Sequence, residues 1–289
     1  MREGGILLVG SAGYVGSHLA AHLRSKGHTV VGCDQDLIPG HTQVHSRYQE
    51  LSAKYLAQFS AVLWFAGHSN VGQCQADPAG ALRNNCLDLI EFVSLISPSV
   101  PLIYASSASV YSTQGSTLSS ESAPLMPALT PYDASKSSFD SVATNFFSNT
   151  TGLRMGTVSG WSESLRPDLV FNAMVLSALR DSEVRLANET ARRSLLFLDD
   201  LVLIVEGLLT RKERLDSLPR ILNCASVNTT MGQLANDIAT SFDVKIALLP
   251  DSPTYDFALD CSRLRQLVND LPVRSVVEEA QSFADRMER

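Results

Sequence analysis

Residues 5–16 read Gly5-Ile6-Leu7-Leu8-Val9-Gly10-Ser11-Ala12-Gly13-Tyr14-Val15-Gly16. The apolar run that stops at Gly10 predicts a short buried strand, and residues 14–26 have the apolar spacing of a helix. Glycines between a strand and a helix permit a tight turn, a close approach of the backbone to a pyrophosphate, and close helix–strand packing. The free N–H groups of the helix N-terminus favour phosphate. We predict a dinucleotide site formed by Gly10, Gly13, Tyr14, Val15 and Gly16.

The acidic residue Asp34 closes the next predicted strand, residues 29–33, and follows Gly16 by 18 positions. An acid at that place holds the two ribose hydroxyls of NAD. Its charge repels a 2′-phosphate, and no Arg or Lys follows in residues 35–37. We therefore predict NAD rather than NADP as the cofactor. The alternative is a structural turn that binds no ligand.

Strands alternate with helices along the chain, and most of the strands are apolar throughout, which indicates a parallel sheet covered on both faces. We predict an α/β fold, with a Rossmann-type doubly wound parallel sheet and a smaller mixed α/β C-terminal domain. The NAD-binding domain is assigned to residues 1–157, with returning segments at about 195–226, and the substrate-binding domain to 158–289. The predicted strands are residues 5–10, 29–33, 61–66, 101–106, 153–158, 184–187, 194–197 and 220–224. The predicted helices are residues 14–26, 51–59, 78–96, 132–149, 167–180, 199–209, 229–241 and 274–287.

The bulk composition disfavours several classes of protein. The chain has 289 residues, 45% hydrophobic and 18% charged, and a formal charge of −7 with scattered cations, which disfavours nucleic acid as a partner. No apolar run approaches 18 residues, so no membrane span is expected. The five cysteines form no Cys-x-x-Cys pair and indicate buried thiols in a reducing cytoplasm. His18 and His22 lack the Glu of a His-Glu-x-x-His motif, so we expect a solvated helix face and no metal site.

Tyr132 and Lys136 lie four residues apart at the start of a predicted helix, behind Thr130 as a cap and Pro131 in the first turn. Residues i and i+4 share a helix face, so the ammonium can lie beside the phenol. Lowering a tyrosine pKa from near 10 by about three units requires roughly 4 kcal/mol, which Lys136 and an oxidised nicotinamide ring are expected to supply. Ser107, at the end of a predicted strand, is placed to hold the reacting oxygen. The alternative is a surface helix with one aromatic residue.

Around these motifs the chain resembles the NAD-dependent epimerase/dehydratase family, the extended branch of the short-chain dehydrogenases/reductases, over most of its length. The matching segments are Leu8 to His18, Phe65-Ala66-Gly67, Ser106 to Tyr111, Glu121, Pro124 and Pro131 to Lys136. The resemblance implies that the catalytic residues are Ser107, Tyr132 and Lys136. It implies cofactor contacts by Phe65, Ala66, Gly67, Asn85, Tyr132 and Lys136. It also implies that a nucleotide-diphosphate sugar is bound by Ser107, Ser109, Asn172 and Arg193. An arginine suits this role because a guanidinium binds phosphate through two hydrogen bonds, although an exposed, solvated arginine is the alternative.

In the resembling enzymes the tyrosine takes the proton of a sugar hydroxyl, usually at C4, while hydride passes to NAD. Dehydratases of this kind use an Asp-Glu pair after the catalytic hydroxyl, and here those positions hold Ala108 and Ser109. We therefore predict an NAD-dependent nucleotide-sugar epimerase. A 4-keto reductase or dehydrogenase with net redox change has the same three catalytic residues and stays open. A non-catalytic dinucleotide-binding protein is a further alternative.

The family likeness also implies a homodimer. Residues 78–96 and 132–149 would meet a partner across a helix bundle, with Phe139, Val142 and Phe146 as the apolar contacts. The alternative is that these side chains pack on the chain's own sheet.

Overall fold

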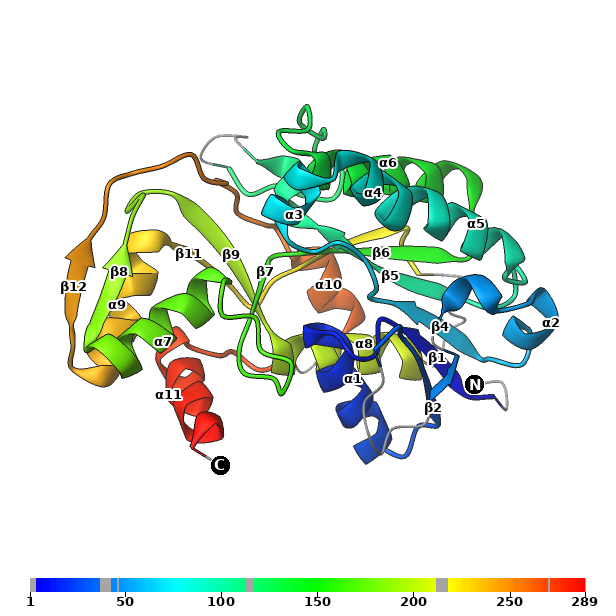
Figure 1. Cartoon of the computed structure of the whole chain (residues 1–289), viewed down its shortest axis with the longest axis horizontal. Coiled ribbons are helices and arrows are strands. Elements are labelled where there is room, and N and C mark those ends of the chain that lie inside the picture. Colours follow the sequence, from blue (N-terminus) through cyan, green and yellow to red (C-terminus); the bar gives the residue numbers. More distant parts are fainter. Residues whose placement is uncertain are drawn as a thin grey trace.

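The computed structural model describes residues 4–36, 43–45, 47–112, 117–211, 218–269 and 271–288. Its main sheet has seven parallel strands in the order β10-β6-β5-β4-β1-β2-β3 (Figure 1). These strands are β1 (Ile6–Val9), β2 (Val30–Cys33), β3 (Gln43–His45), β4 (Ala61–Trp64), β5 (Leu102–Ser107), β6 (Thr150–Met155) and β10 (Ile221–Cys224). The chain builds outward from β1 in both directions. This order confirms the predicted Rossmann-type doubly wound sheet.

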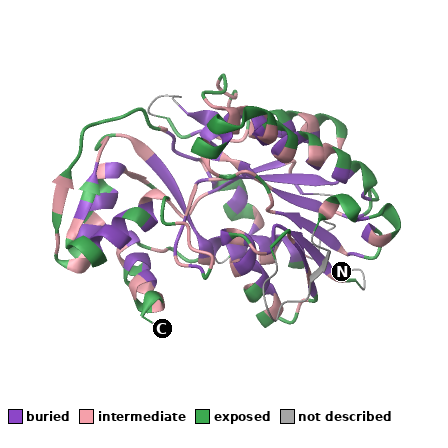
Figure 2. Ribbon diagram, viewed as in Figure 1, coloured by how far each residue is buried: buried purple, intermediate pink, exposed green. Residues whose placement is uncertain are grey.

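Helices cover both faces of this sheet (Figure 1). One face carries α4 (Pro78–Leu82), the π-helical turn η2 (Arg83–Leu87), α5 (Asp88–Leu95) and α6 (Pro131–Phe146). The other carries α1 (Tyr14–Ser25), α8 (Leu198–Thr210) and α10 (Ser262–Leu267). Successive side chains of a strand point to opposite faces, so Ile6 and Leu8 join one core while Leu7 and Val9 join the other. Figure 2 shows the strands buried between the two helix layers.

A second lobe follows β6 and contains two small sheets (Figure 1). Its strands are β7 (Thr157–Ser159), β8 (Glu183–Leu186), β9 (Arg192–Phe197), β11 (Val227–Thr230) and β12 (Lys245–Leu248), and its helices are α7 (Val170–Asp181), α9 (Met231–Phe242) and α11 (Val276–Met287). Phe171, Phe197 and Phe283 lie at the centre of its core. Within the predicted returning segment, β10 joins the main sheet and α8 packs on α1, whereas β9 belongs to the sheet β11-β9-β7. The division of the chain at residue 157 stays a prediction.

Several short helices and strands were not predicted from the sequence, because they are short. The missed elements are β3, α3 (Val71–Ala76), β11, β12 and α10. Each has three to six residues, too few to show a helical or strand period by itself. The remaining short elements are the 3-10 turns η1 (Tyr48–Glu50) and η3 (Ala108–Tyr111) and the helix α2 (Ala53–Leu56). The predicted helix 78–96 is confirmed as the continuous succession α4, η2 and α5.

The expectation that Phe139 faces a partner chain is wrong. Its side chain is 1% exposed and packs edge-on against Tyr104 of the main sheet, with ring centroids 4.7 Å apart. Val142 is half-buried, and only Phe146 is exposed, at 78%. The face of α6 that carries Phe139 is therefore used by the chain's own core.

The two histidines of α1 also differ from expectation, because they do not lie on a solvated face. His18 Nε2 lies 2.9 Å from Asp199 Oδ1, and His22 Nε2 lies 2.7 Å from Glu206 Oε2, both carboxylates belonging to α8. All four side chains are about four-fifths buried. These contacts fix α8 against α1, underneath the glycine loop.

A buried glutamate, Glu279 on α11, makes the stability of the fold depend on pH. Burial, and next the negative charge of Asp199, raise the pKa of Glu279 from 4.5 to about 7, against the opposing charges of Arg274 and Arg286. Between these two values the folded protein holds a proton that the unfolded chain has lost. Stability therefore falls as the pH rises through this window.

We expect Glu279→Gln to unfold at a higher urea concentration than the wild type near pH 8. The expected gain is about 3 kcal/mol, because the variant never carries the buried charge. The gain should shrink toward zero as the pH is lowered below about 4.5, where the wild-type side chain becomes neutral in both states. Equal stability of the two proteins across this pH range, measured by circular dichroism, would contradict the assignment.

Candidate active site

A cavity of about 1140 Å³ opens where the main sheet meets the second lobe. It is lined by residues at the carboxyl ends of β1, β2, β4 and β5 and by residues of the second lobe. Ligands of open α/β sheets bind at this edge, so the cavity is the candidate active site. Every predicted site residue lines it except Gly16, Asn85 and Asn172.

The glycine loop has the geometry that a dinucleotide requires. Gly10 has a φ of +87°, which favours glycine, and it turns the chain out of β1. A Cβ on Gly16 would lie 1.9 Å from the Gly10 carbonyl oxygen, so Gly16 permits helix–strand packing and does not reach the cavity. A Cβ on Gly13 would meet only that same oxygen, at 3.5 Å, which leaves room for a ligand. Gly13 is also the N-cap of α1 and provides no side-chain cap, so the N–H groups of the first turn face the space where a pyrophosphate fits.

Asp34 stands at the end of β2, beside this loop. Its Oδ2 accepts a hydrogen bond from the Ala12 N–H (2.8 Å), and its Oδ1 accepts one from the Asp36 N–H (3.2 Å). Asp34, Gln35 and Asp36 all line the cavity, so its wall at this end carries two acids. This charge suits ribose hydroxyls and opposes a 2′-phosphate.

We expect Asp34→Asn to weaken NAD binding by about tenfold, because a hydrogen bond to a charged acceptor is worth roughly 1.5 kcal/mol. The amide oxygen still accepts from Ala12, so the loop keeps its shape. The ratio of NADP affinity to NAD affinity should rise, since one repulsive charge is gone. Calorimetric titration of both cofactors measures this, with Gln35→Ala as the control on the same wall. An unchanged NAD affinity would contradict the role of Asp34.

Tyr14 joins the glycine loop to the second lobe. Its hydroxyl is buried, donates to the Gly160 carbonyl oxygen (2.7 Å), and accepts from the Asn172 Nδ2 (3.1 Å). Asn172 is 0% exposed, and its amide also donates to the Arg166 carbonyl oxygen and accepts from the Gly160 N–H. The prediction that Asn172 contacts the substrate is therefore wrong for this conformation, because both ends of its amide are used within the protein.

Asn85 likewise supports the site without lining it. From η2, its Oδ1 accepts from the His68 N–H (2.8 Å), and its Nδ2 donates to the His68 carbonyl oxygen and the Ser135 hydroxyl (both 3.0 Å). Asn85 is 2% exposed, so its side chain does not reach the cavity where a cofactor would bind. Its hydrogen bonds instead hold the loop after β4. Phe65, Ala66 and Gly67 of that loop do line the cavity.

The three predicted catalytic residues come together at one point of the cavity. Ser107 ends β5, and Tyr132 and Lys136 lie on the first turns of α6, which is capped by Thr130. The Ser107 side chain lies near the Tyr132 phenol and favours its ionised form, and its hydroxyl lies 2.9 Å from the hydroxyl of Ser109. Lys136 Nζ lies 5.8 Å from the centre of the Tyr132 ring and donates to the Ala105 carbonyl oxygen (2.9 Å).

The protonation of Tyr132 and Lys136 depends on their burial in the protein. Burial raises the pKa of Tyr132 above its ordinary value, although the Ser107 side chain opposes this rise. Burial also lowers the pKa of Lys136, to about 8. In the protein alone, burial therefore outweighs the interactions that would lower the pKa of the phenol. A further positive charge inside the cavity is needed, and an oxidised nicotinamide ring would supply one.

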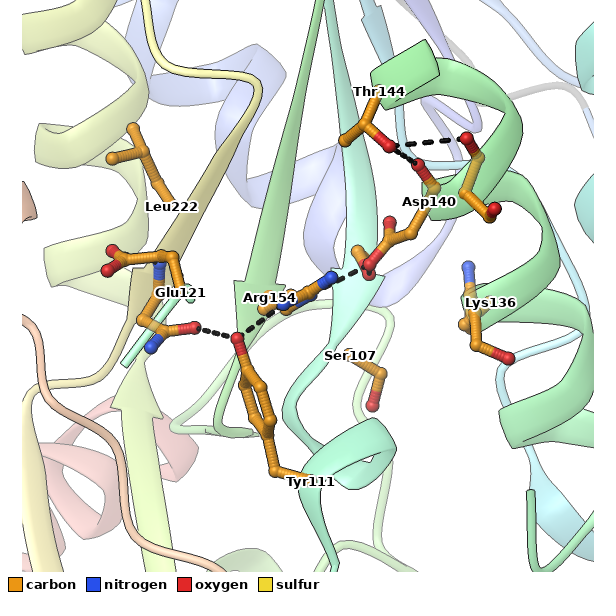
Figure 3. A network of polar contacts seen from close by, with 12 residues as sticks. Ser107, Tyr111, Glu121, Lys136, Asp140, Thr144, Arg154 and Leu222 are labelled. Carbon is orange, nitrogen blue, oxygen red and sulfur yellow. Dashed lines mark hydrogen bonds and ion pairs between the residues drawn. The ribbon is translucent and has the colours of Figure 1, made fainter. Parts of the chain in front are cut away.

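Beneath the catalytic residues lies a buried polar network that joins β5, β6 and α6 (Figure 3). The Asp140 carboxylate accepts from Tyr104 Oη (2.9 Å), Ser106 Oγ (2.9 Å) and Arg154 Nε (2.8 Å). Arg154 also donates to the Tyr111 hydroxyl, so it lies between Tyr111 and Asp140. The network fixes α6, and with it Tyr132 and Lys136, against the strand that ends in Ser107.

Arg193 provides a cation on the second lobe's side of the cavity. It is 6% exposed, its Nη2 donates to Thr254 Oγ1 (2.8 Å), and its guanidinium lies 5.3 Å from the centre of the Phe257 ring. Burial lowers the pKa of Arg193 to about 10, so it remains charged at neutral pH. A buried guanidinium facing a cavity suits a phosphate group.

Sequence reasoning missed Arg166 and Tyr255, which both line the cavity. Arg166 makes two hydrogen bonds to Asp168 (2.8 and 2.6 Å) and a third to the Ser69 hydroxyl (2.8 Å), which ties the segment before α7 to the loop after β4. Tyr255 reaches the site from the Pro-rich C-terminal stretch. Both residues reach the cavity through contacts with residues that are distant in sequence. The sequence itself shows only that Arg166 and Asp168 are two residues apart.

Two kinds of feature are absent from the described residues. No helix in that part of the chain has the length and apolar character to cross a membrane. No group of three or more His, Cys, Asp or Glu side chains there has a metal-binding arrangement. The five cysteines are all buried and free.

The doubly wound sheet and the glycine loop are those of a dinucleotide-binding protein, and the Ser107, Tyr132 and Lys136 side chains lie at the edge of the same cavity. A model of the NAD dependent epimerase/dehydratase family matches residues 6–225, and the chain belongs to this family. Its cofactor is accordingly NAD. The predictions of family, fold and cofactor are confirmed.

Individual relatives agree with this assignment. A UDP-glucose 4-epimerase of Rhizobium meliloti (strain 1021) is 32% identical over 107 residues, and the match spans only 32% of that relative's length. A solved NAD dependent NDP-hexosamine 5,6-dehydratase involved in tunicamycin biosynthesis superimposes with a TM-score of 0.85, at 22% identity and 99% coverage of both chains. The UDP-glucuronic acid 4-epimerase of Bacillus cereus gives 0.82 at 20% identity, covering 98% of this chain and 99% of its own. At these identities the structural likeness shows the fold.

Proposed function

We propose that this protein is an NAD-dependent nucleotide-sugar epimerase that inverts a hydroxyl-bearing carbon of the sugar, at C4. The observation that carries the proposal is the meeting of Ser107, Tyr132 and Lys136 in one cavity with a buried arginine, Arg193, on its opposite lobe. A protein that only binds a dinucleotide needs none of these four side chains.

Each side chain has a task that its position supports. The Tyr132 phenolate oxygen takes the proton of the sugar hydroxyl, and the Ser107 hydroxyl holds the same oxygen as negative charge develops on it. Lys136 fixes the cofactor's ribose and keeps its charge near the phenol. Arg193 binds the diphosphate, so the sugar is tethered by its nucleotide while its ring stays free to turn. Bound NAD supplies a reversible acceptor for the hydride of the oxidised carbon.

The residues after Ser107 favour epimerisation over dehydration. Ala108 is apolar and 0% exposed, and the hydroxyl of Ser109 is close to that of Ser107. Neither side chain can remove a proton from C5 of the sugar or protonate a leaving hydroxyl, as dehydration requires. The relatives include UDP-sugar 4-epimerases and dehydratases, and the epimerase reading agrees with these two positions.

The proposal is tested by incubating the purified protein with NAD and a panel of nucleotide sugars that includes UDP-glucose and UDP-glucuronic acid. NMR should show a sugar epimer as the product, while the absorbance of NADH stays constant. Stoichiometric formation or consumption of NADH would instead favour the reductase or dehydrogenase, which uses the same three residues.

We further propose a homodimer and a cytoplasmic location. Leu87 on η2 and Phe146 on α6 are 51% and 78% exposed, and they would meet a second copy across a helix bundle. The five free, buried thiols suit a reducing compartment.

A further inference from the structure

A C-terminal segment, residues 251–260, runs along the second lobe's side of the cavity, and we call it the strap. At one point it contacts the proposed diphosphate site: Thr254 Oγ1 accepts from Arg193 (2.8 Å), and the Phe257 ring lies beneath the Arg193 guanidinium. Asp256 adds an ion pair to Arg192 (2.8 Å). The strap is therefore bound to the strand, β9, that carries the buried cation.

Next to Thr254, the strap also contacts the helix that carries the proposed base. The Tyr255 hydroxyl donates to both carboxylate oxygens of Asp133 (3.2 and 3.1 Å) and lies 3.2 Å from Thr130 Oγ1. Thr130 caps α6, and Asp133 directly follows Tyr132 in the first turn. One side chain thus links the Arg193 region to the start of the catalytic helix.

Asp133 is a buried charge that acts on Tyr132. It is 2% exposed and receives hydroxyl hydrogen bonds from Thr130 (2.8 Å) and Tyr255, with no cation in ion-pair contact among the described residues. Burial is the main cause that raises the pKa of Tyr132, the Ser107 side chain opposes it, and the Asp133 charge raises it further. The other titratable groups that face Tyr132 are Lys136 on the same helix, Cys74 of α3, Arg166, which precedes α7, and Tyr255 itself.

We propose that Tyr255 is a positioning residue for the general base: its hydroxyl holds and partly neutralises the Asp133 carboxylate, and so connects the strap at Arg193 to the protonation of Tyr132. The inference rests on the proposed function, since it takes Tyr132 as the base. Donated hydrogen bonds spread the carboxylate's charge, which weakens its repulsion of a phenolate on the next residue.

Tyr255→Phe tests this link, because it keeps the ring that lines the cavity and removes only the hydroxyl. The acid limb of the pH profile of kcat should move to higher pH by about half a pH unit, because Asp133 then repels the phenolate more strongly. Asp133→Asn should move the same limb to lower pH. In the Asp133→Asn background, Tyr255→Phe should cause no further movement, since the charge through which it acts is gone.

A matched control lies beside it on the strap. Thr254→Val removes the acceptor of Arg193 and should raise KM for the nucleotide sugar without moving the acid limb. A role of Tyr255 in folding alone would lower activity without moving the limb. A movement of equal size in the Asp133→Asn background would overturn the proposal, because the effect would then not pass through Asp133.

Absorbance titration of the phenolate provides a readout that needs no turnover. The Tyr132 signal is isolated by subtracting the curve of Tyr132→Phe, in the wild type and in the Tyr255→Phe background. A higher pH at the midpoint of the Tyr132 titration in the Tyr255→Phe background supports the inference. If that result is obtained but no sugar is converted, only the proposed function fails. If sugar is converted but the profiles and midpoints of Tyr255→Phe and wild type coincide, the inference fails and the proposed function stands.

Discussion

Replacing Tyr132 with phenylalanine is expected to lower kcat for sugar conversion by about 10²- to 10⁴-fold, the range for loss of a positioned general base. The phenol lies in the cavity beside Ser107, and phenylalanine keeps the ring but cannot take a proton. The glycine loop and Asp34 are untouched, so NAD affinity should stay within about twofold of wild type. Steady-state kinetics and calorimetric NAD titration measure the two quantities.

A matched tyrosine outside the cavity provides the control. Tyr55 lies on α2, where its ring packs on Phe59, and Tyr55→Phe should keep wild-type turnover. If Tyr132→Phe retained more than about a tenth of the wild-type kcat, the assignment of the base would be rejected.

Replacing Asp140 with alanine is expected to destabilise the fold by about 3–5 kcal/mol. The substitution leaves the buried guanidinium of Arg154 without its carboxylate (Figure 3). It also removes the acceptor of the Tyr104 and Ser106 hydroxyls. Urea unfolding followed by circular dichroism measures the loss. The Asp140 charge also raises the pKa of Lys136, so the ammonium of the variant should titrate at lower pH.

An exposed ion pair offers the comparison for this variant. Asp181 pairs with Arg185 at 2.9 Å, but their side chains are 44% and 54% exposed. Asp181→Ala should therefore change stability by no more than about 0.5 kcal/mol. Similar losses for the two aspartate variants would show that burial of the Arg154–Asp140 pair does not matter.

The parts of the fold that could be predicted are those that depend on residues close together in the sequence. The strand, turn and helix of residues 5–25 follow from apolar spacing and from glycines that the turn and the packing require at Gly10 and Gly16. The parallel sheet follows from apolar strands alternating with helices. The strap could not be predicted, because residues 251–260 are ordered by contacts with Arg193, Asp133 and Ser119, which are distant in sequence.

In the site, too, only the features that depend on residues close together in the sequence could be predicted. Ser107, Tyr132 and Lys136 were found because their spacing places them at a strand end and on one helix face. Asn85 and Asn172 have the residue types that the family likeness requires, but the structure directs their amides inward, to His68 and to Gly160. The protonation of Tyr132 could not be predicted either, because burial dominates it and burial is a property of the whole fold.

Conversion of a nucleotide sugar that carries deuterium at C4 tests the central claim most directly. The account predicts an epimeric product that retains deuterium at C4, with the NAD oxidised at the end as at the start, because the same atom leaves and returns. Deuterium lost to the solvent, or NADH accumulating in step with the sugar consumed, would contradict it.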